Sequence, residues 1–460
     1  MRACVITIGC RLNQAEGDAL RMALKDEGNE VITWGQGDRL NPALEHSLDI
    51  VIVNTCAVTE QAVRTSKKWI RRIAGLQPKP RLVVTGCLAE IEFEQLQNES
   101  GVDEVITQTQ KVKLIEDCPI LPSRSRAFLK IQDGCWNRCA YCLPAQIRGD
   151  PVSKPISMVE KEIRDLLAKG FKEIVLVGLN LGAYGLDLGT SLFALLVKLA
   201  QIDGDFRIRL GCLEPDSFPK AILERFSELR LCPHLHIPLQ SGDDKILNLM
   251  QRKYSVAQYQ ALLERIVSHI PEVNIGTDLV VGFPGEDEAS FNRTFDLISK
   301  LPFGYLHIFP YSPRPQTPAY SRPETVNQKE KKKRVNLLRS LSREKSLKFR
   351  SRFLGQVRDA LLELPEAKRG LLQAMTDNYI RIFIPPPKES IWQADDTGLS
   401  LFQHQRVKVL ITEVRRDKTF GKLERFFTAE LGGLTVSRDR ERSTNNGERE
   451  KLGMPNLAIG

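Results

Sequence analysis

The sequence lacks a long hydrophobic run. No window reaches the roughly 18 consecutive apolar residues that a membrane-spanning helix requires. The opening segment "MRACVITIGC" also lacks the charged region and apolar stretch that are typical of a signal peptide. We therefore expect a cytoplasmic protein with no membrane partner. Thiols stay reduced in that compartment, so clustered cysteines indicate metal ligands or catalysts rather than disulfides.

The excess of one charge is moderate, with 66 lysines and arginines against 57 acidic residues. The distribution is more informative, because residues 329–352 hold eleven basic and two acidic side chains. A second basic run lies at 64–72. Either run alone would be read as a solvated helix face, but two runs on one chain favour a polyanionic partner such as nucleic acid.

The length of 460 residues predicts two to four domains, and their pattern predicts an α/β fold. Residues 1–120 should form an α/β layer domain, because continuous valine and isoleucine runs alternate with amphipathic segments. Its strands are expected at 4–9, 49–54 and 81–86.

Residues 121–350 restart the alternation after a proline- and serine-containing linker at 118–126. Six strand-then-helix units, without a seventh or eighth, predict an open (βα)6 partial barrel rather than a complete eightfold one. Its strands are expected at 127–131, 173–178, 207–211, 234–239, 274–283 and 305–311. Residues 351–425 have the short alternating runs of a small β-barrel, and residues 426–460 are polar and aperiodic, which predicts a disordered tail.

Cys135, Cys139 and Cys142 form a C-x3-C-x2-C motif just after the first expected barrel strand. A structural zinc site is closed by four ligands, yet the next cysteine is Cys212 and the next histidine is His234. A [4Fe–4S] cluster fits better, because three thiolates leave one iron open for a substrate or cofactor. Barrel enzymes place their chemistry at this end of the strands.

Cys10, Cys56 and Cys87 each follow an expected strand of the amino-terminal sheet. The carboxyl ends of parallel strands meet at one edge, where open α/β sheets bind ligands. Three unrelated small core residues are the alternative, which would be favoured for any one of them alone. The repeated placement favours a second three-thiolate cluster.

The motifs resemble the radical S-adenosylmethionine (SAM) methylthiotransferase family, and they occur in the family's order. They are "GCRLNQAEGDA", "VNTCAVTEQAVRTSKKWIRR", "VVTGCLAE", "KIQDGCWNRCAYC", "EIVLVGLNLGAYG", "HLHIPLQSGDDKIL", "TDLVVGFPGE" and "LHIFPYSPRPQTPA". The resemblance implies two [4Fe–4S] clusters, SAM as cofactor and a carboxy-terminal barrel similar to an RNA-binding TRAM domain.

The resemblance also implies a division of labour. The cluster on Cys135, Cys139 and Cys142 would cleave SAM to a radical, and the amino-terminal cluster would carry the sulfur to be inserted. A reducing electron donor and a sulfur source are required, and the sequence identifies neither. We expect SAM to be held by strand-end residues, namely Gly178, Asn180, Glu214, Gln240, Ser241 and Asp278.

The implied substrate is a tRNA anticodon stem-loop. "NTCAVTEQA" resembles the branch that acts on N6-threonylcarbamoyladenosine at position 37, giving the 2-methylthio form. That group carries a carboxylate, so a cationic partner is expected, with Arg148 and Arg314 as candidates. The candidates for RNA contact are Lys331, Lys332, Lys333 and Arg334. Alternatives are N6-isopentenyladenosine in tRNA, an aspartate of a ribosomal protein, or a nucleic-acid binding module with a structural cluster.

Overall fold

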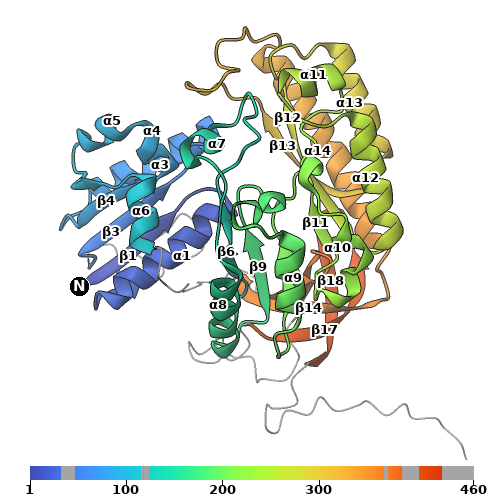
Figure 1. Ribbon diagram of the computed structural model, residues 1–460, viewed down its shortest axis with the longest axis horizontal. Helices are drawn as coiled ribbons and strands as arrows, with labels where there is room; N and C mark the ends of the chain where they lie inside the picture. The colour runs from blue at the N-terminus through green and yellow to red at the C-terminus, as the bar shows by residue number, and fades with distance from the viewer. Residues whose placement is uncertain (33–46, 116–117, 119–123, 367–370, 386–403, 427–460) are drawn as a thin grey trace, which may run out of the picture. The chain divides into compact units, whose positions relative to one another are not determined.

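The computed structural model describes residues 1–32, 47–115, 118, 124–366, 371–385 and 404–426. The expected tail at 426–460 lies outside the described residues except for Phe426, as does part of the expected linker. The division into three domains stays a prediction, and the elements are described below in chain order (Figure 1).

The amino-terminal part is a parallel five-stranded sheet with the strand order β2-β1-β3-β4-β5. Helices pack on both faces, which explains why its central strands are continuous apolar runs. The edge strands β2 and β5 are only three and two residues long and were not predicted. The bounds are β1 (Arg2–Thr7), α1 (Arg11–Asp26), β2 (Glu30–Ile32), β3 (Ile50–Thr55), α3 (Glu60–Ala74), β4 (Arg81–Gly86), α4 (Cys87–Ile91), α5 (Phe93–Gln97), β5 (Glu104–Val105) and α6 (Gln108–Ile115).

The central part is an open row of six parallel strands, as predicted. Two three-stranded sheets, β6-β9-β10 and β11-β12-β13, are joined by the bridge between Cys212 and His236. The strands are β6 (Ala127–Lys130), β9 (Glu173–Val177), β10 (Arg207–Leu210), β11 (His234–His236), β12 (Asn274–Val281) and β13 (Phe303–Pro310).

Helices cover the outside of this row, and their apolar faces form the largest core of the protein. The longer ones are α8 (Ile156–Ala168), α9 (Leu192–Ala200), α12 (Val256–His269), α13 (Glu288–Lys300) and α14 (Gln328–Ser351). The short elements are β7 (Gln132–Asp133), α7 (Leu143–Arg148), β8 (Val152–Ser153), η1 (Leu181–Ala183), η2 (Leu186–Leu188), η3 (Pro215–Ser217), α10 (Ala221–Glu224), η4 (Phe226–Glu228) and α11 (Asp244–Leu249).

The carboxy-terminal part is a closed five-stranded barrel with the order β14-β15-β16-β18-β17. The first half of β17 alternates buried and half-buried positions, as expected for strands that pack on one face only. Its strands are β14 (Val357–Glu366), β15 (Leu371–Thr376), β16 (Arg381–Ile384), β17 (Arg406–Val414) and β18 (Thr419–Phe426).

A buried charge network joins this barrel to the partial barrel. Glu173 pairs with Arg207 and Arg209, which lie next to it on β10. The two arginines then donate to the backbone carbonyls of Met375, at 3.0 Å, and Asp377, at 2.9 Å.

Among the described residues, no single helix is long and apolar enough to cross a membrane. Only the bent pair formed by η1–η2 and α9 is long and apolar enough by length and composition. Four leucines of α9 are buried in the core of the protein.

Candidate functional site

The C-x3-C-x2-C loop lies between β7 and α7, and it brings its three thiols together. Cys135 and Cys139 are buried, and Cys142 caps the amino end of α7. Burial raises the pKa of Cys142 to about 12, with contributions from the nearby thiols of Cys139 and Cys135. Thiols that are hard to ionise alone become thiolates when metal binds, with release of protons.

Polar groups from other strand ends surround this loop. Arg252 donates from Nη1 to the Sγ of Cys139 at 3.1 Å and also pairs with Glu214. Asn180 hydrogen-bonds to Cys135, and its Oδ1 accepts from Ser217 at 3.1 Å. Two of the predicted SAM contacts, Asn180 and Glu214, therefore lie beside the cysteines.

Residue 178 is a glycine at a position where the side chain of Gln132 lies very close to the backbone. A Cβ at this position would lie 2.6 Å from the Oε1 of Gln132, the same oxygen that accepts from the backbone N–H of Asn180 at 2.9 Å. A larger residue would displace Gln132 and so move Asn180. Gly178 thus positions Asn180, whatever else it contacts.

The remaining predicted SAM contacts lie elsewhere. The Gln240 backbone, with a positive φ of 69°, bridges to β12 through Asp278 and Val280. The Ser241 hydroxyl lies 3.4 Å from the Oγ1 of Thr294 on α13, so it faces a helix. Their assignment to SAM stays a prediction.

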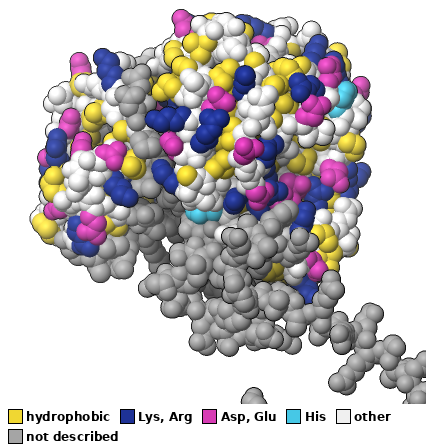
Figure 2. All heavy atoms as spheres, turned by 60° about the horizontal axis from the view of Figure 1, so that its bottom comes forward, with side chains coloured by type: hydrophobic (Ala, Val, Ile, Leu, Met, Phe, Trp, Pro, Cys, Tyr) yellow, Lys and Arg dark blue, Asp and Glu magenta, His cyan; other side chains and the backbone are white. Residues whose placement is uncertain are grey.

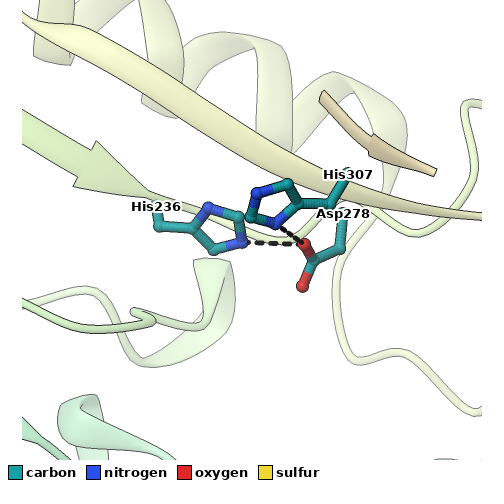
Figure 3. A group of neighbouring side chains, drawn as sticks. All are labelled: His236, Asp278 and His307. Carbon is teal, nitrogen blue, oxygen red and sulfur yellow. Dashed lines mark hydrogen bonds and ion pairs between the residues drawn. The ribbon is translucent and has the colours of Figure 1, made fainter. Parts of the chain in front are cut away.

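Asp278 is held by two histidines from the neighbouring strands (Figure 3). Its Oδ1 lies 2.9 Å from the Nε2 of His236 and 3.2 Å from the Nδ1 of His307. Burial opposes ionisation of Asp278, yet the two histidines hold its pKa well below the usual range. Tyr305 extends the network, because its hydroxyl lies 3.1 Å from His236 and 2.9 Å from His234. His234 and His236 therefore act as hydrogen-bonding residues in this network.

The second set of thiols, Cys10, Cys56 and Cys87, converges at the carboxyl edge of the amino-terminal sheet. Burial raises the pKa of Cys56 to about 12, with contributions from Cys10 and Cys87. Gly9 has a φ of +109°, and a Cβ there would lie 2.7 Å from the Sγ of Cys56. Only glycine lets the chain bring Cys10 this close to Cys56.

Neither set of cysteines is spaced for a single metal ion. Four thiolates around one zinc lie about 3.8 Å apart, given Zn–S bonds near 2.3 Å. In the part of the chain that the structure describes, only His236, Asp278 and His307 bring three potential ligand atoms within 4.8 Å of one another. The three thiols of each set therefore do not all lie within 4.8 Å of one another.

Arg148 lies in a buried charge network between the two sets of cysteines. Its guanidinium is 2.8 Å from both Glu16 and Asp133, and Nη2 is 4.0 Å from the Sγ of Cys87. The side chain is 1% exposed. Lys111 and Lys130 complete the network by pairing with Glu16. Two carboxylates already neutralise the charge of Arg148, which favours a structural role for this residue over contact with the carboxylate of the substrate.

Comparisons with known proteins agree with this geometry. Residues 129–298 match the radical SAM superfamily, and residues 2–107 match a family described as Uncharacterized protein family UPF0004. Threonylcarbamoyladenosine tRNA methylthiotransferase MtaB of Thermotoga maritima is 34% identical over 399 residues, which cover 82% of this chain and 89% of the relative.

The chain belongs to the radical SAM methylthiotransferase family. The family and fold predictions are confirmed, as are SAM and two [4Fe–4S] clusters as the cofactors typical of it. A solved radical SAM methyltransferase, TsrM from Kitasatospora setae, shares the fold at a TM-score of 0.53 and 14% identity, covering 69% of this chain and 77% of its own. The residues that hold the cofactors stay predictions.

Substrate choice within the family is not decided by overall similarity. The tRNA-2-methylthio-N(6)-dimethylallyladenosine synthase of Thermotoga petrophila is 33% identical over 402 residues, covering 81% of this chain and 88% of its own. Its sequence identity differs by one percentage point from that of the Thermotoga maritima relative, and this difference does not favour either substrate. The choice must be argued from side chains near the cysteines.

Arg314 of this methylthiotransferase lies beside the amino-terminal cysteines. Its loop contacts the start of α3, where the backbone N–H of Glu60 donates to Ser312 at 3.3 Å. Burial lowers the pKa of Arg314, while the nearby groups of Glu60, Cys56 and Glu92 oppose the shift. Nη2 donates to Ser312 at 2.9 Å, but the buried Nε has no hydrogen-bond partner. Arg314 therefore has an unused donor close to Cys56.

The four predicted RNA contacts on α14 divide into two pairs. Lys331 is buried and pairs with Glu324 at 2.6 Å, and Arg334 is buried and pairs with Glu286 at 2.6 Å. Lys332 and Lys333 are exposed. Lys331 and Arg334 therefore hold α14 against the partial barrel, and Lys332 and Lys333 face outward.

Proposed function

We propose that this enzyme converts N6-threonylcarbamoyladenosine at position 37 of tRNA, next to the anticodon, to its 2-methylthio derivative in the cytoplasm. The observation that carries the substrate choice is Arg314, a half-buried arginine near Cys56 whose buried Nε has no hydrogen-bond partner. A threonylcarbamoyl group brings a carboxylate that would accept from this donor, whereas an isopentenyl group has no acceptor. The name of the Thermotoga maritima relative supports the same choice.

The chain offers a separate holder for each cofactor. Cys135, Cys139 and Cys142 would hold one cluster and Cys10, Cys56 and Cys87 the other. When bound there, the clusters and SAM would supply the organic radical and the sulfur that methylthiolation of an unactivated C–H bond requires. Arg252 lies against Cys139 and Glu214, so it offsets negative charge that thiolate ligands bring to a buried loop. We expect Asn180 and Glu214, which lie beside these cysteines, to contact SAM.

The substrate test uses two anticodon stem-loops that differ only in the N6 group of the adenosine. Reconstituted enzyme should methylthiolate the threonylcarbamoyl stem-loop and not the isopentenyl one. The opposite preference would show that the isopentenyl alternative is correct. Modification of neither RNA would favour the ribosomal-protein alternative.

Arg314 is tested by Arg314→Gln and Arg314→Lys. A hydrogen bond to a charged group contributes about 1.5–3 kcal/mol, so Arg314→Gln should raise KM for the threonylcarbamoyl stem-loop by roughly tenfold or more. Arg314→Lys should keep part of the affinity, because it keeps the charge. Arg265→Gln, a matched change on the outer helix α12, should leave KM unchanged. Equal KM in wild type and Arg314→Gln would remove Arg314 from the account.

A further inference from the structure

The exposed face of α14 is a basic stripe that leads away from the cysteines. Lys332, Arg339 and Arg343 are spaced at i, i+7 and i+11, so they lie on one side of the helix. All three are exposed, and none has an acidic partner among the described residues. Figure 2 shows that basic and acidic side chains are mixed over the face of the protein drawn in it. The net charge of +9 therefore says less about an RNA-binding site than the positions of individual basic residues do.

The stripe ends at a cavity of about 480 Å³ between the partial barrel and the carboxy-terminal barrel. Its walls are the amino ends of β12 and β13, the second half of α14 and segments of the carboxy-terminal barrel. One carboxylate, Asp417, lines it, together with five cationic side chains, which are Arg343, Arg350, Arg381, Arg416 and Lys418.

Arg381 lies 3.8 Å from Glu363, and Lys418 lies over the Phe383 ring, which leaves Arg343 and Arg416 to bind an anion. Arg350 donates to the carbonyls of Arg415, Arg416 and Lys418, so it is occupied. Arg343 and Arg416 are exposed and have no acidic partner in the described ranges. They stand on α14 and on the β17–β18 turn, on the two parts of the chain that form the walls. A phosphate between them would satisfy both.

The cavity also offers rings and a buried acceptor. Tyr305, Tyr379, Phe349 and Phe383 line it. Tyr379 already stacks on His234, with ring centroids 4.2 Å apart, and Lys418 lies over the Phe383 ring, so the rings offer a base their remaining apolar surface rather than open stacking faces. Asn274 is 4% exposed, and its Nδ2 donates to the carbonyl of Asn378 at 2.9 Å. Its Oδ1 is buried without a hydrogen-bond partner. Such an acceptor is costly unless a ligand N–H or O–H reaches it.

We propose that this cavity binds a nucleotide of the RNA substrate at a distance from the modified adenosine. Its phosphate would lie between Arg343 and Arg416, and its base against the rings. Asn274 and Tyr305 lie at the amino ends of their strands, and the C-x3-C-x2-C loop follows the carboxyl end of its own. The two ends of an eight-residue strand lie about 23 Å apart. The inference rests on the proposed function only in requiring an RNA substrate.

The test is binding of a fluorescein-labelled, unmodified tRNA transcript to the full-length holoenzyme, measured by anisotropy over a range of salt. Arg343→Gln/Arg416→Gln should raise Kd by roughly tenfold. It should also lower the slope of log K against log salt by about one, because one neutralised phosphate is lost. Arg343→Lys/Arg416→Lys should keep most of the affinity. The matched control is Lys161→Gln/Lys169→Gln, on α8 and at its carboxyl cap, where both lysines are exposed, and it should bind like wild type.

The transcript carries no N6 group, so the result does not depend on which adenosine is modified. If wild type binds and the cavity variant binds equally well, the cavity proposal fails and the proposed function stands. The cavity proposal also fails if the α8 control weakens binding as much, because then only total charge matters. If wild type does not bind the transcript at all, the cavity proposal fails, and the assay with the two modified stem-loops decides the proposed function separately.

Discussion

The guanidinium of Arg252 lies 3.1 Å from the Sγ of Cys139, and it pairs with Glu214 on the other side. It therefore links a predicted cluster ligand to a predicted SAM contact. Burial raises the pKa of Cys139, and Arg252 opposes that shift. Removing this charge should make the thiolate harder to form and the loop harder to load with iron.

Arg252→Gln should lose iron from the first set of cysteines and cleave SAM at least about tenfold more slowly. Arg252→Lys should recover part of both, because it restores the positive charge. Iron analysis and mass spectrometry of 5′-deoxyadenosine provide the measurements. Wild-type iron content and cleavage rate in Arg252→Gln would show that the contact has no role.

Cys139→Ala and Cys56→Ala should separate the two steps of the reaction. Each change should reduce iron from about eight to about four atoms per chain. Cys139→Ala should abolish SAM cleavage, whereas Cys56→Ala should still release 5′-deoxyadenosine but insert no sulfur. The account of two separate clusters is wrong if Cys56→Ala still forms methylthiolated nucleoside. Cys118→Ala, outside both sets, is the control.

Glu173 should contribute strongly to stability. Its burial disfavours the charge, but Arg209 and Arg207 hold its pKa well below the usual range. Glu173→Gln leaves the buried guanidinium of Arg209 without a carboxylate and Arg207 with Asp359 alone, which should lower the free energy of unfolding by about 3–5 kcal/mol. Glu228→Gln, at an exposed pair with Arg225, should have little effect.

The same lowered pKa predicts a pH dependence. The contribution of Glu173 is complete above its ordinary pKa of 4.5 and is lost as the pH falls below that value toward the lower folded pKa. Urea unfolding between pH 3 and pH 7 measures it. Wild type should lose part of its advantage over Glu173→Gln at the acid end, and a constant difference across this range would contradict the assignment.

The basic run on α14 should show two distinct kinds of effect. Arg334→Gln should lower the thermal unfolding temperature, because it leaves the buried carboxylate of Glu286 unpaired. Lys332→Gln/Lys333→Gln should keep that temperature and weaken tRNA binding, with a smaller salt slope. Differential scanning fluorimetry and anisotropy distinguish the two. Equal tRNA affinity in Lys332→Gln/Lys333→Gln and wild type would show that these lysines are only a solvated face.

The sequence was most informative where a chemical motif follows a strand. Cys56 and Cys87 come directly after apolar runs of a parallel sheet, so their meeting at one edge could be predicted. The partners of Arg252 could not, because Glu214 and Cys139 lie 38 and 113 residues away in the chain. Arg148 and Glu16 are separated by 132 residues, and only the folded chain shows that they pair.

The basic run at 329–352 shows a limit of a different kind. The composition of this run predicted that Lys331 and Arg334 contact RNA together with Lys332 and Lys333. Lys331 and Arg334, however, lie on the buried side of α14. The signal was present, because Val335 and Leu338 continue the same helical face at spacings of four and seven from Lys331. Charge density predicts a partner, and periodicity must be added to predict which charges reach it.

The most direct test of the proposed activity is nucleoside mass spectrometry of bulk tRNA. The protein should be expressed in a host whose tRNA contains both N6-threonylcarbamoyladenosine and N6-isopentenyladenosine but neither methylthio derivative. Wild type should produce the 2-methylthio form of N6-threonylcarbamoyladenosine alone, and Cys139→Ala and Cys56→Ala should produce neither. Appearance of the 2-methylthio isopentenyl nucleoside instead, or of no methylthio nucleoside with wild type, would contradict the account.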